Sequence, residues 1–159
     1  MNTIKLFTDG SVNPQLKIGF GAYLVVDNSS LVNCLQDTIK IKKFENTSST
    51  LLELQTLLWA LDEINLSGIV HIYTDCQNIL GLKKRCEEFE KNGYMTKSHK
   101  LISNHELYKA FYKKIKSLDC EFIKVKGHKK TSTKDEIDTF FTLVDKASRN
   151  ALREYKACV

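Results

Sequence analysis

Proline is almost absent from this chain, since Pro14 is the only one among 159 residues. A collagen-like or proline-rich disordered architecture is therefore excluded. The five cysteines are odd in number and form no C-x-x-C pair, which argues against a zinc site or a disulfide framework and favours reduced thiols. No apolar run approaches the length of a membrane span, and the first residues lack the apolar core of a signal peptide. We therefore expect a cytoplasmic protein without a membrane partner.

Charge and apolar content are ordinary for a folded domain. Apolar residues make up 42% of the chain, charged residues make up 27%, and the net charge is +5. These values exclude intrinsic disorder, and the length suits a single domain over residues 1–159. If several acids gather in one site, the remaining surface is more basic than the net charge suggests. A polyanionic partner fits this surface, although a lysine-rich solvated surface explains the charge nearly as well.

The hydrophobic periodicity predicts a mixed α/β domain. We predict strands over residues 3–9, 19–26, 31–44, 69–74 and 120–125, and helices over residues 47–68, 77–91 and 138–156, with one more capped by Asn104. The step at Gly10 and Ser11, together with Asn13 and Pro14, indicates a turn after the first strand. Short connections between the first three strands predict an antiparallel meander. The full order is strand-strand-strand-helix-strand-helix-helix-strand-helix.

Four acids stand where a carboxylate is costly to bury. Asp9 and Asp75 close predicted strands, whereas Glu53 and Asp145 lie on the apolar sides of predicted helices. Removing a carboxylate from water is unfavourable unless a positive charge compensates for it. If the fold gathers all four, their repulsion requires cations, and hard divalent ions such as Mg²⁺ prefer carboxylate oxygens. The pattern therefore points to metal-dependent phosphoryl chemistry.

Each acid also has a local explanation. Asp9 can begin a turn before Gly10, Glu53 can close a capping box with Thr50, Asp75 can cap the following helix, and Asp145 can pair with Arg149. Four unrelated explanations for four such positions are less economical than one shared site.

Five segments of the chain, taken in order, resemble the type 1, bacterial branch of the ribonuclease H family. They are residues 6–11, 53–54, 72–75, 125–128 and 144–151. The resemblance covers essentially the whole chain, and the predicted elements between the motifs also agree with the family. It implies a ribonuclease H-like fold, with a five-stranded mixed sheet whose first three strands are antiparallel and with flanking helices.

The resemblance implies a metal-dependent endoribonuclease that cuts the RNA strand of RNA–DNA hybrids by two-metal-ion catalysis. The products would carry 5′-phosphate and 3′-hydroxyl ends. Asp9 would bridge two Mg²⁺ ions, Glu53 and Asp75 would share the ion that activates water, and Asp145 would complete the ion on the leaving-group side. Mn²⁺ is a possible substitute for Mg²⁺. His128 resembles the family histidine implicated in proton transfer or product release.

The resemblance also implies contacts with the hybrid. Near the first motif and the first helix these are Gly10, Ser11, Asn13, Ser48, Ser49, Thr50 and Gln77. The basic segment over residues 83–100 corresponds to a handle that grips the DNA strand, with Lys84, Arg85, Phe89 and Tyr94 as contacts. Three features depart from the common bacterial pattern. Ser49 and Thr50 replace an asparagine pair, the usual glycine-rich turn after the first motif is altered over residues 12–17, and the link over residues 129–138 is longer than usual.

Two other functions remain open at this point. One is a retroelement-type or junction-directed nuclease of the same fold, and the other is a nucleic-acid-binding module without catalysis. The helix-borne Glu53 and the Lys126-Gly127-His128 motif favour ribonuclease H over the former, and the presence of all four acids argues against the latter. Because no motif requires a second copy of the chain, we expect a monomer.

Overall fold

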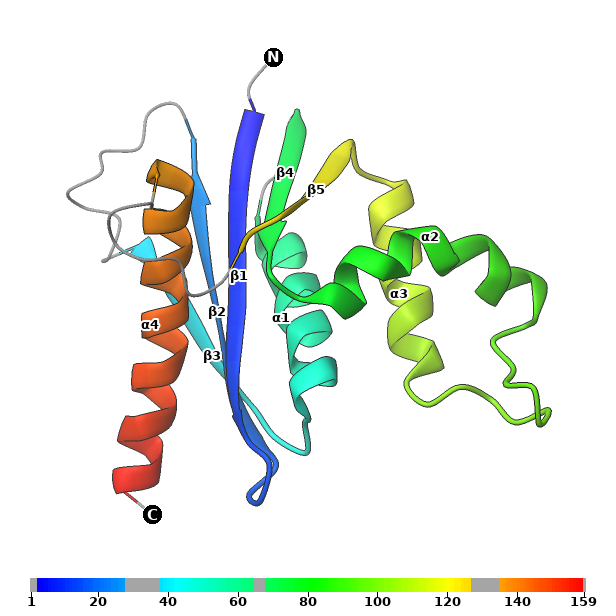
Figure 1. Ribbon diagram of the computed structural model, residues 1–159, viewed down its shortest axis with the longest axis horizontal. Coiled ribbons are helices and arrows are strands. Elements are labelled where there is room, and N and C mark those ends of the chain that lie inside the picture. Colours follow the sequence, from blue (N-terminus) through cyan, green and yellow to red (C-terminus); the bar gives the residue numbers. More distant parts are fainter. Residues whose placement is uncertain (1–2, 28–37, 65–67, 127–134, 159) are drawn as a thin grey trace.

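The computed structural model describes residues 3–27, 38–64, 68–126 and 135–158. Its strands are β1 (Thr3–Asn13), β2 (Ile18–Val26), β3 (Lys40–Phe44), β4 (Ile69–Thr74) and β5 (Cys120–Lys124). Its helices are α1 (Ser49–Glu63), α2 (Gln77–Lys91), α3 (His105–Lys116) and α4 (Glu136–Ala157). This order of elements is the predicted one, and Figure 1 shows their arrangement. Within the described ranges, no helix has the length and apolar character needed to cross a membrane.

One mixed sheet holds the fold together, with the strand order β3-β2-β1-β4-β5. Strands β1, β2 and β3 pair in antiparallel fashion, whereas β4 runs parallel to β1 and β5 runs parallel to β4. This arrangement confirms the predicted meander and five-stranded mixed sheet. Strand β1 is central, so its side chains are covered on both faces of the sheet. Strand β4 ends beside the middle of β1, because β1 pairs with β4 only as far as Phe7 opposite Tyr73 and then continues to Asn13.

The two faces of the sheet carry separate hydrophobic cores because successive side chains on a strand point to opposite faces. Leu6 packs into a core shared with α1, α2 and α3, whereas Phe7 packs into a core shared with α4. Phe7 stacks on Tyr73 of β4 and meets Phe140 of α4 edge-on. In Figure 1, α4 lies on one side of the sheet and α1 on the other.

Glycines in β1 and β2 allow α1 to lie unusually close to the sheet. A Cβ atom at Gly21 would lie 2.1 Å from Oγ1 of Thr56, and one at Gly10 would lie 2.8 Å from Cδ2 of Leu52. Carbon atoms do not approach an oxygen or another carbon this closely, so a side chain at either position would push the helix away. This close contact brings the first turns of α1, including Glu53, next to β1.

Two strand boundaries differ from prediction. Strand β1 does not turn at Gly10 and Ser11 but continues to Asn13, because β2 pairs with it as far as Asn13 opposite Ile18. The third strand was predicted over residues 31–44, but the observed strand begins at Lys40, and residues 31–37 fall outside the described ranges. The alternation through Thr38 and Ile39 is not used for pairing, since β2 pairs with β3 only from Lys40 onward.

Helix boundaries also show two differences. Helix α1 ends at Glu63 rather than near Gly68, with Ile64 in an extended conformation after it. Asn104 precedes α3 in a left-handed conformation, and its side chain makes no capping hydrogen bond. In contrast, α4 begins with a full capping box between Asp135 and Asp138, so these two acids serve the start of the helix.

Candidate active site

Asp9 and Asp75 are brought together by the register of two parallel strands. Phe7 of β1 lies opposite Tyr73 of β4. Two residues further along both strands, the same register places Asp9 beside Asp75 at the carboxyl end of β4. Asp75 does not cap α2, because the residue in the capping position is Cys76. Its local explanation as a helix cap is therefore wrong, and its position beside Asp9 accounts for it.

Glu53 reaches the same place from the opposite direction, on helix α1. The helix is capped by Ser48, whose hydroxyl accepts a hydrogen bond from the backbone N–H of Leu51 at 3.3 Å. A capping box between Thr50 and Glu53 is therefore ruled out, since Thr50 already lies inside the helix. With its local explanation removed, Glu53 is left as a helix residue directed at β1.

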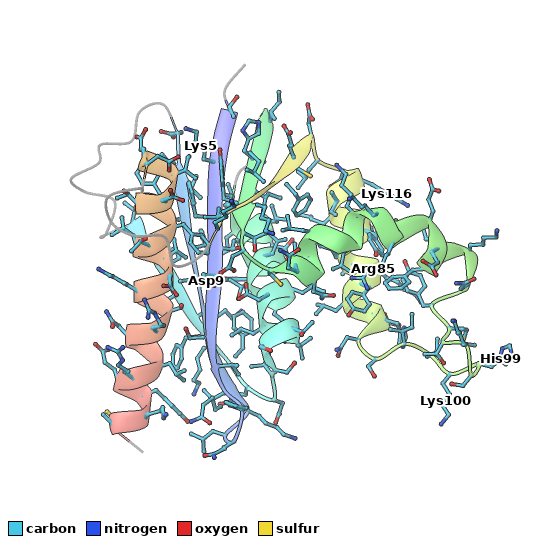
Figure 2. The ribbon with its side chains drawn as sticks, in the orientation of Figure 1. Lys5, Asp9, Arg85, His99, Lys100 and Lys116 are labelled. Atoms are coloured by element: carbon cyan, nitrogen blue, oxygen red, sulfur yellow. The ribbon has the colours of Figure 1, made fainter. Side chains whose placement is uncertain are left out.

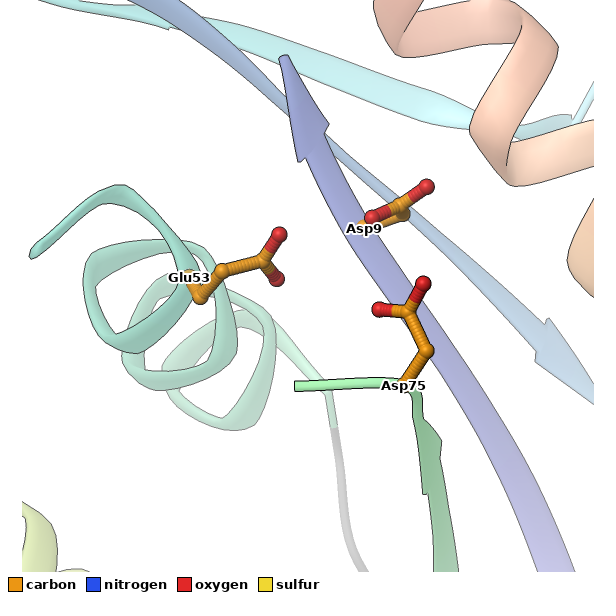
Figure 3. Close-up of side chains that lie close together, drawn as sticks. All are labelled: Asp9, Glu53 and Asp75. Atoms are coloured by element: carbon orange, nitrogen blue, oxygen red, sulfur yellow. The ribbon is translucent and has the colours of Figure 1, made fainter. Parts of the chain in front are cut away.

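The three carboxylates form one compact group. Asp9, Glu53 and Asp75 each offer a ligand oxygen, and these oxygens all lie within 4.8 Å of one another. Figure 3 shows the side chains converging from β1, α1 and the end of β4. Asp9 is buried, with 6% of its surface exposed, and the other two are half-buried. Three acids from distant parts of the chain thus share a space that one cation could fill.

Without a cation, this group is electrostatically unfavourable. Burial raises the pKa of Asp9 far above its ordinary value, and the charges of Glu53 and Asp75 raise it further. The pKa of Glu53 is also raised, mainly by burial and secondly by the charge of Asp75. The backbone N–H of Gly10 opposes both shifts because it stabilises the charged forms. The free protein therefore retains protons on this group at neutral pH.

Asp145 adjoins the group from α4. A hydrogen bond between its carboxyl and that of Asp9 contributes to the raised pKa of Asp9. Its Oδ2 also accepts a hydrogen bond from Nη2 of Arg149 at 2.8 Å, so the ion pair expected from sequence is present as well. The hydroxyls of Ser148 and Ser11 lie 3.2 Å apart and tie α4 to β1 beside the site. Asp145 is thus a neighbour of the three-carboxylate group and contacts it through its hydrogen bond with Asp9.

The donor set fits a hard divalent cation. All three ligands are carboxylate oxygens, which Mg²⁺ and Mn²⁺ prefer over softer donors. Among the described residues, Oε2 of Glu53 is buried without a hydrogen-bond partner. A buried carboxylate oxygen that lacks a partner is costly, and a bound cation would satisfy it. The residues that could hold such an ion are Asp9, Glu53 and Asp75, with Asp145 adjacent to Asp9.

The predicted substrate contacts near the first helix and first strand differ in their exposure to solvent. Ser48, Ser49, Thr50 and Gln77 are exposed. The Asn13 side chain is buried and accepts hydrogen bonds from the backbone N–H groups of Gln15 and Leu16, so it stabilises the β1–β2 turn. Gly10 contributes its N–H to the carboxylates and its missing side chain to the packing of α1. The turn role of Asn13 agrees with the turn predicted at Asn13 and Pro14, whereas the two roles of Gly10 were not indicated by the sequence.

The basic segment that was predicted to grip DNA forms an extension made of α2, α3 and the link between them (Figure 1). Lys84 is exposed, and Figure 2 shows His99 and Lys100 at the far end of the extension. Phe89 instead packs against three tyrosine rings, and Tyr94 is 8% exposed. Arg85 donates a hydrogen bond to Oδ1 of Asn78 at 3.0 Å. The aromatic residues therefore build the extension's own core, which leaves its lysines facing solvent.

His128 and the preceding Gly127 lie outside the described residues, so the role assigned to this histidine stays a prediction.

The chain matches a known family and known relatives. The family model described as RNase H matches residues 1–149. A ribonuclease H from Orientia tsutsugamushi is 30% identical over 132 residues, which cover 79% of this chain and 71% of the relative. A ribonuclease H from Clostridium botulinum is 28% identical over 89 residues, which are 55% of this chain. That match spans 60% of the relative's length.

The fold has counterparts among solved structures. The solution structure of the PFV RNase H domain superposes with a TM-score of 0.69 at 14% identity, covering 94% of this chain and 92% of the domain. At this identity the likeness concerns the fold alone, and it agrees with the five-stranded mixed sheet described above. The family match over almost the whole length, the identity to curated relatives and the shared fold lead to one conclusion: the chain belongs to the ribonuclease H family of nucleases.

Proposed function

We propose that this protein is a metal-dependent endoribonuclease that hydrolyses the RNA strand of RNA–DNA hybrids and leaves 5′-phosphate and 3′-hydroxyl ends. The observation that carries the proposal is the group of carboxylate oxygens from Asp9, Glu53 and Asp75 within 4.8 Å of one another. Family membership supports the substrate class, since the relatives found are ribonucleases H. Two divalent ions, Mg²⁺ or in its place Mn²⁺, are the proposed cofactor.

The proposed ligands are the four acids that sequence analysis selected. Asp9, Glu53 and Asp75 would hold the ions directly, and Asp145 is placed to complete the set through its contact with Asp9. When bound, such ions activate a water molecule and stabilise charge on the leaving oxygen. The carboxylates meanwhile fix the position of the scissile phosphate relative to β1 and α1. Proton transfer or product release is assigned to His128 as a prediction.

Recognition of the hybrid would use exposed hydroxyl and amide groups beside the carboxylates. Ser49, Thr50 and Gln77 are exposed on either side of the acidic group and suit hydrogen bonds to 2′-hydroxyls, which distinguish RNA from DNA. Hydroxyls reach less far than the asparagine side chains they replace. We therefore expect specific but weak 2′-hydroxyl contacts, supplemented by Lys84 and the exposed lysines of the α2–α3 extension.

A gel assay with four substrates tests the proposal. One end-labelled RNA strand is offered alone, paired with DNA and paired with RNA, and a DNA duplex of the same sequence serves as the fourth substrate. Each reaction contains Mg²⁺, Mn²⁺ or EDTA. Cleavage confined to the hybrid and dependent on metal, with product RNA that a 5′-phosphate-dependent exonuclease degrades, is expected. Equal cleavage of the DNA duplex would contradict the substrate assignment and favour a junction-directed or DNA-directed nuclease.

A further inference from the structure

A second, basic site lies beside the carboxylates, where α4 meets the last part of β1. It is a surface groove with a volume of about 330 Å³, lined by Ser11, Val12, Arg149, Leu152, Arg153 and Lys156. Three of the six lining residues are cations, and none is an acid. The groove adjoins the active site on its β1 side and on its α4 side. On β1, Ser11 follows Asp9 and Gly10, and on α4, Arg149 pairs with Asp145.

The cations form a stripe that starts at the active site. Asp145, Arg149, Arg153 and Lys156 follow one another at intervals of four, four and three residues, so they lie on one face of α4. At a rise of about 1.5 Å per residue, the stripe extends roughly 16 Å from Asp145 toward the end of the helix. It therefore has the length to follow a nucleic-acid backbone away from the carboxylates.

Most of this charge has no partner within the protein. Arg153 and Lys156 are exposed, and among the described residues neither forms an ion pair with a carboxylate. Favourable interaction with the helix dipole accounts for a cation in the last turn, such as Lys156, but it decays within one turn. Arg149 and Arg153 lie before that last turn. Arg149 is paired with Asp145, but Arg153 and Lys156 leave the groove with a net positive charge, which matches a strand of phosphates.

We propose that this groove binds backbone phosphates of the RNA strand next to the cleavage site, with Arg153 as its central contact. This inference rests on the proposed function. The RNA strand is the choice because the stripe continues directly from Asp145, where the scissile phosphate of the RNA would lie. Helix α4 is also on the opposite side of β1 from the α2–α3 extension, which is assigned to the DNA strand (Figure 1). The two strands of the hybrid thus have separate basic surfaces.

Salt-dependent binding tests the groove. The variant Arg153→Gln is compared with Lys40→Gln, which removes one charge from an exposed position on the edge strand β3, outside both the groove and the α2–α3 extension. Both substitutions are made in the Asp9→Asn background, so that the labelled hybrid stays intact, and its dissociation constant is measured from 50 to 300 mM NaCl. Losing one phosphate contact should reduce the slope of log K against log[salt] by about 0.9 and weaken binding roughly fivefold. Lys40→Gln should leave the slope unchanged.

A second arm assigns the strand. Hybrids with a short ribonucleotide block, which fixes the position of the enzyme, are shortened on either side in the RNA-containing strand or in the DNA strand. The effect of Arg153→Gln should disappear when the RNA-containing strand is shortened on one side, and it should persist when only the DNA strand is shortened. The reverse pattern would overturn the strand assignment.

The two levels of the account fail separately. Tight hybrid binding with equal slopes for Arg153→Gln and Lys40→Gln would overturn the groove while leaving the proposed function intact. No preference for the hybrid over a DNA duplex in any variant would overturn the proposed function, and with it the ligand assigned to the groove. Circular dichroism and thermal unfolding of both variants should match the parent protein, because both positions are exposed.

Discussion

Replacing Asp9 by asparagine should stabilise the metal-free protein while destroying its metal response. The substitution keeps the size of the side chain but removes one charge from a buried group whose oxygens lie within 4.8 Å of one another. In the wild type, burial and the charges of Glu53 and Asp75 keep Asp9 protonated at neutral pH. Folding must therefore hold a proton that the unfolded chain would release, and this costs free energy.

The magnitude follows from the ordinary pKa of Asp9, which is 3.8. Holding this proton at pH 7 costs about 1.4 kcal/mol for each of roughly 3.2 pH units, or about 4 kcal/mol. Two unit charges 4.8 Å apart repel each other by about 3.5 kcal/mol at an effective dielectric constant of about 20, which is a similar magnitude. Asparagine is itself costly to bury. We expect a net gain of about 1–3 kcal/mol in the free energy of unfolding.

Urea unfolding followed by circular dichroism measures this gain. In EDTA, the midpoint for Asp9→Asn should lie about 0.5–1.5 M above that of the wild type. In 10 mM Mg²⁺ the wild type should gain stability and the variant should not, because only the wild type retains the bound ion's central ligand. Asp119→Asn makes the same chemical change at an exposed site and should alter neither value. A midpoint for Asp9→Asn at or below that of the wild type in EDTA would refute the repulsion argument.

Three further predictions follow from the same contacts. The stability difference between Asp9→Asn and the wild type in EDTA should widen as pH rises from about 4 through neutrality, because an acid with a raised folded pKa loses stabilisation above its unfolded pKa; a constant difference would contradict the shift. Gly21→Ala should cost about 1–3 kcal/mol through its clash with Thr56, and Thr56→Ala should recover part of this loss in the double mutant, as thermal unfolding would reveal. Ser48→Ala should cost about 1 kcal/mol by removing the cap of α1, measured in urea; no loss would mean that the cap is not used.

The sequence predicted those parts of the site that depend on local order along the chain. Asp9 and Asp75 were recognisable as acids that follow apolar runs on two strands, and the parallel register of β1 and β4 places them together, although β1 continues beyond Asp9. Glu53 lies on a helix that the sequence predicted. The close approach of this helix to β1 requires that Gly10 and Gly21 carry no side chain. The Gly19-Phe20-Gly21 pattern in β2 was the available signal for this close approach.

Features set by long-range contacts escaped prediction. The packing of the half-buried Phe89 against Tyr108 and Tyr112 of α3, and of Tyr94 against Phe89, was not visible in the sequence, and the predicted contact of Phe89 and Tyr94 with substrate stays a prediction. The extension of β1 past Ser11 depends on pairing with β2, which overrides the turn tendency of Gly10 and Ser11. The groove along α4 needed the neighbouring Ser11 and Val12 to define it, although the spacing of Arg149 and Arg153 was visible in the sequence.

The measurement that tests the central claim most directly is the initial rate of hybrid cleavage as a function of Mg²⁺ concentration, for the wild type, Asp9→Asn and Asp119→Asn at equal concentrations. The account predicts a rate that rises with Mg²⁺ from zero in EDTA for the wild type and Asp119→Asn, and a loss of at least a hundredfold for Asp9→Asn. Cleavage that persists in EDTA, or an Asp9→Asn variant that cuts at the rate of the wild type, would contradict a metal site built on Asp9, Glu53 and Asp75.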